Sequence, residues 1–249
     1  MPVKSDRTAW LKGGKARCNV APPNQTNPHR LVLLGAPGVG KGTQAELLSA
    51  EVGACHLSTG DIFRAIKTAD ACECTPTMAR ALTCMARGDL VADEIVLGLV
   101  TERAGCLRCR GGFLLDGFPR TVAQAEALDK VLETQKVTVD AVLNYDLPLE
   151  QIISRLNGRR TCSICKSVFH VDTRPPRTQG ICDHCGAALY QREDDRMESV
   201  RVRMDAYQKS TAPLTEYYRR KGLLLSIPAE GAPEEILART LKALKARKG

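Results

Sequence analysis

The sequence predicts an α/β fold in which a parallel β-sheet core is flanked by helices and carries two inserted lobes. Four short apolar runs, each bounded by glycine, proline or charged residues, are typical of buried parallel strands. They cover residues 30–35, 112–117, 140–148 and 222–229. Segments with helical spacing lie between them, and this alternation favours a sheet covered on both faces.

Three helices can be placed by their ends. Residues 43–53 follow the first strand, have apolar residues at helical spacing and finish at Gly53, a residue suited to ending a helix. Residues 121–135 begin with Thr121 and Gln124 in a capping-box pattern. Residues 234–249 form an amphipathic segment whose cations come late, which favours a helix C-terminus.

Two stretches interrupt the alternation. Residues 58–91 have helical character without a strand, and residues 158–195 have few long apolar runs. Both are interpreted as mobile lobes inserted into the core, which would then consist of residues 30–57, 92–157 and 196–249.

The positive charge is concentrated at one end of the chain. The net charge of the 249 residues is +8, and residues 1–30 contribute +5 of it, with six Lys or Arg against Asp6 alone. The near-neutral remainder argues against a nucleic-acid-binding protein. Residues 1–29, with their polar, proline-containing stretch 21–29, are predicted to be a disordered basic extension. Its role stays open between targeting, weak anion binding and none.

The sequence also indicates in which cellular compartment the protein is expected. The sequence shows neither an apolar stretch long enough for a membrane helix nor a secretory signal, so a cytoplasmic protein without membrane association is expected. Thiols stay reduced in that compartment, and eleven cysteines, an odd number, argue against a complete disulfide framework.

A glycine-rich segment, GAPGVGKGT at 35–43, lies between the first predicted strand and helix. This context is typical of a P-loop, whose backbone N–H groups surround phosphate oxygens at a helix N-terminus. Lys41 would add a full positive charge. A glycine, Gly42, stands before Thr43 where the plain motif has Ser or Thr directly after the lysine. The loop residues expected to bind ATP are Gly38, Val39, Gly40, Lys41, Gly42 and Thr43.

An acidic residue, Asp116, ends the apolar strand at 112–117. In P-loop folds an acid at this place holds Mg²⁺, usually through water. A turn-forming Asp before Gly117 is the alternative. With a P-loop in the same chain, the metal role is favoured.

Four motifs in order, GKGT, STGDIFR, LLDGFPRT and GRR, resemble the adenylate kinase family from about residue 30 to the end. The resemblance implies a P-loop kinase that transfers a phosphoryl group between ATP and AMP to give two ADP. It also implies that residues 58–91 bind the monophosphate and that residues 158–195 form a lid over ATP. The partners are then ATP, AMP and ADP. Binding to nucleic acid or to a membrane is not expected. The protein is expected to be a monomer.

By resemblance, the AMP site is formed by residues from several separate segments that follow the glycine-rich loop in the sequence. Asp61 would also lie near the waters of Mg²⁺. Ser58 and Asp61 alternatively form a capping box, and Gln124 is equally the capping partner of Thr121. The implied AMP-binding residues are Thr59, Arg64, Asp89, Leu90, Val91, Gly117, Arg120, Gln124, Arg192 and Arg203.

Phosphoryl transfer to a phosphate needs charge neutralisation and in-line positioning more than a general base. Converging cations are therefore expected. Arg155 and Arg159 share a helix face at a spacing of four. The alternative is that arginines on one helix face are solvated and form salt bridges without a functional role. By resemblance the catalytic set is Lys41, Arg120, Arg155, Arg159, Arg192 and Arg203, of which Lys41, Arg155 and Arg159 also bind ATP.

Two C-x-x-C pairs lie inside the predicted lid. Their spacing is typical of a closed tetrahedral Zn²⁺ site with a structural role, because the lid has too little apolar sequence for a core of its own. A disulfide pair and a nucleic-acid-binding zinc ribbon are the alternatives. The ligands are Cys162, Cys165, Cys182 and Cys185, and the resemblance adds Val168 and Phe169 as contacts for the ATP base.

Mg²⁺ and structural Zn²⁺ are thus the expected cofactors. Three rival functions remain open: a UMP/CMP kinase, a GTP:AMP phosphotransferase, and a nucleotide-switched zinc-ribbon protein that binds nucleic acid. Thr59 favours AMP, because pyrimidine-specific relatives usually have a smaller residue there.

Overall fold

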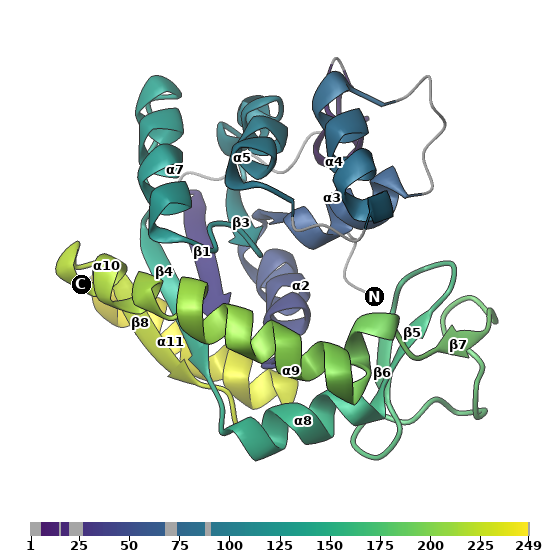
Figure 1. The fold of residues 1–249 in the computed structure, drawn as a ribbon. Coiled ribbons are helices and arrows are strands. Elements are labelled where there is room, and N and C mark those ends of the chain that lie inside the picture. Colours follow the sequence, from purple (N-terminus) through teal and green to yellow (C-terminus); the bar gives the residue numbers. More distant parts are fainter. Residues whose placement is uncertain (1–5, 15, 20–26, 68–73, 88–90, 249) are drawn as a thin grey trace.

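The computed structural model describes residues 6–14, 16–19, 27–67, 74–87 and 91–248. Its centre is a five-stranded sheet in the order β2-β3-β1-β4-β8, and every paired neighbour is parallel. Figure 1 shows helices on both sides of this sheet. The α/β expectation is therefore confirmed. The strands are β1 (His29–Gly35), β2 (Cys55–Ser58), β3 (Gly112–Asp116), β4 (Ala141–Asp146) and β8 (Leu224–Pro228).

Both faces of the sheet are buried. Along β1, Val32 and Leu34 belong to one hydrophobic cluster, and Leu31 and Leu33 belong to the other. All four side chains are at most 3% exposed. A strand that is buried on both faces does not show an alternation of apolar and polar residues. It is predicted instead by its short continuous apolar run.

Helices cover both faces of the sheet, and the three helices that the sequence predicts are among them. One cluster includes residues of α7 and α10, and the other includes residues of α2, α8, α9 and α11. A π-helical turn, η3, joins α9 to α10. Their bounds are α2 (Lys41–Val52), α7 (Val122–Thr134), α8 (Leu149–Gly158), α9 (Met197–Ala206), η3 (Tyr207–Thr211), α10 (Pro213–Arg220) and α11 (Pro233–Lys248).

The segment expected to bind the monophosphate is helical in its described part. It contains α3 (Thr59–Ile66) and α4 (Pro76–Arg87), and the chain returns to the core through α5 (Asp93–Thr101) and α6 (Ala104–Leu107). Residues of α3, α4 and α5 join the same hydrophobic cluster as α7. This lobe therefore packs onto the sheet rather than forming an independent core.

The segment expected to form the lid contains a small antiparallel sheet in the order β6-β5-β7. It projects from the end of α8, away from the large sheet (Figure 1). Only three residues form its buried cluster, namely Cys162, Phe169 and Cys182. The elements are β5 (Arg159–Cys162), β6 (Val168–His170), β7 (Leu189–Tyr190) and the 3-10 turn η2 (Glu193–Asp195).

The expectation of a disordered extension over residues 1–29 is wrong for its described part. A short helix, α1 (Thr8–Lys12), packs against α3. The indole of Trp10 is 0% exposed and belongs to the hydrophobic cluster of the sheet. Burial of so large an aromatic surface stabilises an ordered position that polar neighbours in the sequence do not suggest. Among the described helices, none has the length and apolar character to cross a membrane.

Candidate active site

The glycine-rich loop lies between β1 and α2, at the carboxyl edge of the sheet. Gly38 and Gly40 have φ values of 86° and 103°, which favour glycine. A Cβ on Gly38 would lie 2.6 Å from the Leu156 side chain, so the loop also needs glycine for space. The first N–H groups of α2 have no partner within the helix. This end of α2 therefore offers donors and positive potential to a phosphate.

The ammonium group of Lys41 lies inside this loop. It donates hydrogen bonds to the carbonyl oxygens of Gly35 at 2.7 Å and Ala36 at 2.9 Å. Burial lowers the pKa of Lys41 to about 8, although the negative charge of Asp116 opposes this shift. The positive charges of other residues lower this pKa further, namely Arg120, Arg203 and Arg159. The charges of these three arginines therefore act on the loop.

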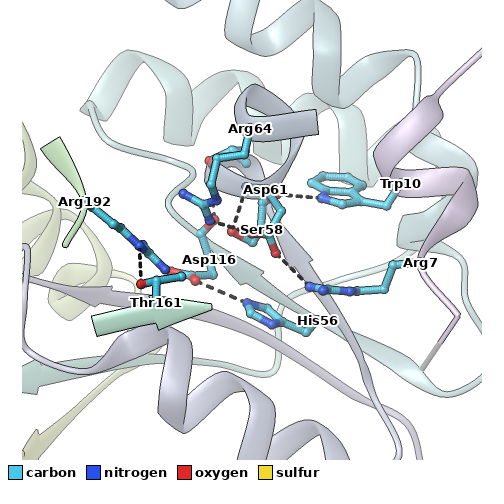
Figure 2. A network of polar contacts seen from close by, with 10 residues as sticks. Arg7, Trp10, His56, Ser58, Asp61, Arg64, Asp116, Thr161 and Arg192 are labelled. Carbon is cyan, nitrogen blue, oxygen red and sulfur yellow. Dashed lines mark hydrogen bonds and ion pairs between the residues drawn. The ribbon is translucent and has the colours of Figure 1, made fainter. Parts of the chain in front are cut away.

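The carboxylate of Asp116 ends β3 beside the loop. Its Oδ2 atom lies 3.2 Å from Nε2 of His56 on the neighbouring strand β2 (Figure 2). Burial raises the pKa of Asp116, but the hydrogen bond with His56 and the charges of Lys41 and Arg120 outweigh burial and lower it overall. A Cβ on Gly42 would lie 3.9 Å from Oδ2. An ionised oxygen donor therefore stands next to the loop, where Mg²⁺ fits.

The end of β2 lies beside the end of β3, with Ser58 opposite Asp116. Ser58 Oγ accepts a hydrogen bond from the Asp61 N–H at 3.3 Å, so Ser58 caps α3. Thr59 Oγ1 donates to the Asp116 carbonyl at 3.4 Å. A Cβ on Gly117, whose φ is +81°, would lie 2.9 Å from Thr59 Oγ1. Thr59 and Gly117 thus face each other closely, as an AMP pocket formed by both would require.

The carboxylate of Asp61 lies between two arginines (Figure 2). Its Oδ1 atom accepts from Arg64 Nη2, and its Oδ2 atom accepts from Arg7 Nη1 at 2.8 Å. Burial raises the pKa of Asp61, but the charges of Arg64 and Arg7 outweigh burial and lower it overall. Each oxygen meets a cation, which is an unfavourable environment for a further cation. Geometry therefore favours a guanidinium-holding role over the predicted Mg²⁺ role.

The side chain of Gln124 is 4% exposed and bonded at both ends. Its Oε1 atom accepts from the Arg120 N–H at 2.7 Å, and its Nε2 atom donates to Asp93 Oδ1 at 2.6 Å. Its backbone N–H donates to Thr121 Oγ1 at 3.1 Å, which confirms Thr121 as the cap of α7. The adenine-reading role stays a prediction.

Arg155 joins α8 to the glycine-rich loop. It donates from Nη1 to the Val39 carbonyl at 3.0 Å and from Nη2 to the Ala229 carbonyl at 2.8 Å. Two carbonyl contacts hold the guanidinium beside the loop backbone. This position suits a residue that contacts a bound nucleotide.

Arg159 and Arg203 meet at the fully buried Asp195 of η2. Arg159 forms a two-point contact with this carboxylate, from Nε to Oδ2 at 2.7 Å and from Nη2 to Oδ1. Arg203 Nη1 lies 3.9 Å from Oδ1. Arg192 donates from Nε to Thr161 Oγ1 on β5 at 2.9 Å (Figure 2). Asp195, in the segment that ends the lid, therefore brings Arg159 and Arg203 together, whereas Arg192 is held by β5.

The four lid cysteines come together as the spacing predicts. Their Sγ atoms all lie within 4.8 Å of one another. Cys162 and Cys185 are 3.4 Å apart, and Cys165 and Cys182 are 3.5 Å apart. Four thiols at such distances match the tetrahedral thiolate set that Zn²⁺ prefers.

Comparisons with known proteins agree with this geometry. Residues 33–223 match the family model for adenylate kinase. The chain belongs to the adenylate kinase family. An adenylate kinase of Carboxydothermus hydrogenoformans is 48% identical over 216 residues, which cover 87% of this chain and 99% of the relative. An adenylate kinase of Caldicellulosiruptor bescii is 51% identical over 217 residues, with 87% and 98% covered.

Two of the remaining residues that the adenylate kinase resemblance implies, Phe169 and Val91, have packing contacts that the sequence did not predict. Phe169 is 3% exposed and packs in the lid core, with its ring centroid 5.9 Å from that of His184. Its side chain is therefore part of the lid core, whereas Val168 is only half-buried. Val91 packs against the sheet cluster. Asp89 and Leu90 lie outside the described residues.

Two residues of this adenylate kinase site were missed by sequence reasoning. His56 contacts Asp116, and Arg7 contacts Asp61. His56 stands two positions before Ser58, a period that places both side chains on one face of a strand. This spacing is informative only if residues 55–58 are recognised as a strand. Four residues are too few to predict a strand from the sequence. Arg7 lies 54 positions from its partner and carries no local signal.

Proposed function

We propose that the chain catalyses the reversible transfer of the γ-phosphoryl group of ATP to AMP, giving two ADP. The observation that carries this proposal is the convergence of Arg120, Arg159 and Arg203 on Lys41, next to the ionised Asp116. Membership of the adenylate kinase family makes the chain an ATP:AMP phosphotransferase.

ATP binds along the loop between β1 and α2. Backbone N–H groups at the start of α2 and the charge of Lys41 hold its phosphates. Arg155 and Arg159 contact them from α8 and the lid, and Val168 covers the base. The loop residues in contact are Gly38, Val39, Gly40, Gly42 and Thr43.

AMP binds where β2 and β3 end. Thr59 and Gly117 border the adenine, and Arg64 and Arg120 hold the phosphate. Gln124 is bonded to the Arg120 backbone and thereby fixes that residue at the end of the pocket. Val91, with Asp89 and Leu90 beside it in the sequence, completes the site.

The transfer step depends on electrostatics and position. The acceptor is already an anion, so the enzyme has no proton to remove from it. Lys41 and the arginines neutralise the charge that the transferring group carries, and closure of the lid excludes water. The arginines that close on this group are Arg120, Arg155, Arg159, Arg192 and Arg203.

Two metals fit this chain. Asp116 supplies an ionised oxygen for Mg²⁺ bound with ATP, which would neutralise phosphate charge there. The four lid cysteines supply the donors for one structural Zn²⁺, which would replace the core that a lid with three buried cluster residues lacks. We propose a cytoplasmic monomer.

The test is a coupled assay of ADP production with ATP, Mg²⁺ and each of AMP, GMP, CMP and UMP. Turnover with AMP alone is expected. Turnover with CMP or UMP would keep the mechanism and overturn the base specificity. A lack of turnover with every acceptor would overturn the proposal.

A further inference from the structure

The N-terminal segment, residues 6–14, forms an ion pair with the monophosphate lobe. Arg7 Nη1 donates to Asp61 Oδ2 at 2.8 Å, while Asp61 Oδ1 accepts from Arg64 Nη2 (Figure 2). Side chains of Arg7 and Asp61 are 21% and 24% exposed, so solvent screens this pair only in part. Arg64, at 42%, is open to solvent and to a ligand.

Buried contacts hold the segment in place. Trp10 is 0% exposed, and its Nε1 atom donates to the Ser58 carbonyl at 2.9 Å. The Trp10 carbonyl accepts from Nε of Arg103 at 2.6 Å. Arg103 is itself 2% exposed and donates from Nη1 to the Leu99 carbonyl at 2.8 Å. Arg7 therefore extends from a fixed helix rather than from a free tail.

We propose that Arg7 is a positioning residue of the AMP site, acting on Arg64 through Asp61. The proposal rests on the proposed function, in which Arg64 binds the AMP phosphate. Asp61 alone would hold Arg64 strongly and repel the phosphate. Arg7 compensates the charge of Asp61, so that one net positive charge remains for the phosphate. The bond from Trp10 to Ser58 places this compensating cation at the start of α3.

The first test compares Michaelis constants. Arg7→Ala is expected to raise KM for AMP about five- to tenfold, the effect of one partly exposed ion pair, and to leave KM for ATP within about twofold. Arg7→Lys keeps the charge and is expected to recover most of the affinity. Arg17→Ala, an exposed cation four positions beyond Gly13, is the matched control and is expected to change neither constant.

A double variant tests whether Arg7 acts by compensating the charge of Asp61 or by an effect that does not involve Asp61. If Arg7 acts by compensating Asp61, its removal matters less once that charge is gone. Arg7→Ala in an Asp61→Asn background is therefore expected to change KM for AMP less than about twofold. Equal effects of Arg7→Ala in both backgrounds would overturn the proposal.

The single tryptophan of the chain reports whether the segment stays docked. Trp10 emission in Arg7→Ala is expected to remain that of a buried indole. A shift to the emission of a solvent-exposed indole would overturn the proposal, because Arg7 would then anchor the segment rather than orient Arg64.

Arg64→Ala distinguishes failure of the two proposals. An unchanged KM for AMP in that variant would contradict the AMP-binding role of Arg64 and hence the proposed site. A raised KM in Arg64→Ala together with an unchanged KM in Arg7→Ala would contradict only the role of Arg7.

Discussion

The indole of Trp10 donates a hydrogen bond to the carbonyl oxygen of Ser58, 48 positions along the chain. Ser58 is the last residue of β2 and the cap of α3. The bond therefore ties the N-terminal segment to the point where the monophosphate lobe leaves the sheet. Both partners are buried, so this link is protected from competition by water.

Replacement of Trp10 by alanine is expected to lower the free energy of unfolding by about 3–5 kcal/mol, since it removes a fully buried aromatic side chain and one hydrogen bond. Urea denaturation followed by far-UV circular dichroism measures this loss without needing the indole. Val202→Ala is the control. Val202 is 69% exposed, so its replacement is expected to change the free energy of unfolding by less than about 0.5 kcal/mol. Equal stability of the two variants would mean that the segment adds nothing to the fold.

Binding of ATP is expected to weaken above pH about 8. Burial lowers the pKa of Lys41 to about 8, so in the free enzyme its positive charge is present below that pH and lost above it. Phosphate next to the amine favours the charged form, and ATP binding near pH 8 should therefore take up a proton. Calorimetry in buffers of different ionisation enthalpy measures this uptake.

The control for that experiment is Lys41→Arg, because a guanidinium stays charged over the whole range. Proton uptake is expected to disappear in this variant. Uptake that persisted unchanged would show that another group titrates, and the assignment to Lys41 would be wrong.

Four of the five core strands were predictable, because each of these four is a continuous apolar run. RLVLLG and GFLLDG correspond closely to β1 and β3. β2 was missed, because CHLS has only four residues and its burial depends on pairing with β3. Four residues carry too little pattern to be distinguished from a loop.

The residues of the candidate site also fall into two groups, those that the sequence could predict and those that it could not. The loop and the lid cysteines belong to local motifs whose spacing is visible in the sequence, and the arginine set follows from the resemblance to adenylate kinases. Partners such as His56 for Asp116, or Asp195 for Arg159, are set by tertiary packing. The ordered place of Trp10 likewise depends on a surface formed by distant elements, and composition alone suggested a tail.

The purified chain is expected to carry about one zinc per molecule, bound by the four lid cysteines. Metal analysis before and after chelation checks the content, and scanning calorimetry checks the stability. Cys182→Ser is expected to reduce zinc content and lower the unfolding temperature, because the lid cluster has only three buried members. Cys84→Ser, on α4, is the matched control and should retain the metal. Equal zinc content in both variants would place the metal elsewhere.

Arg120→Lys is expected to lower kcat by about 100-fold or more. Arg120 donates from Nε to the Gly117 carbonyl at 2.8 Å, and its charge acts on both Lys41 and Asp116. Lysine keeps the charge but has one ammonium group, so it cannot hold this carbonyl and a phosphate with the fixed fork of a guanidinium. Single-turnover measurements with saturating ATP and AMP separate loss of chemistry from loss of binding. A rate near that of the unmodified enzyme would show that charge alone suffices at this position and would remove Arg120 from the catalytic set.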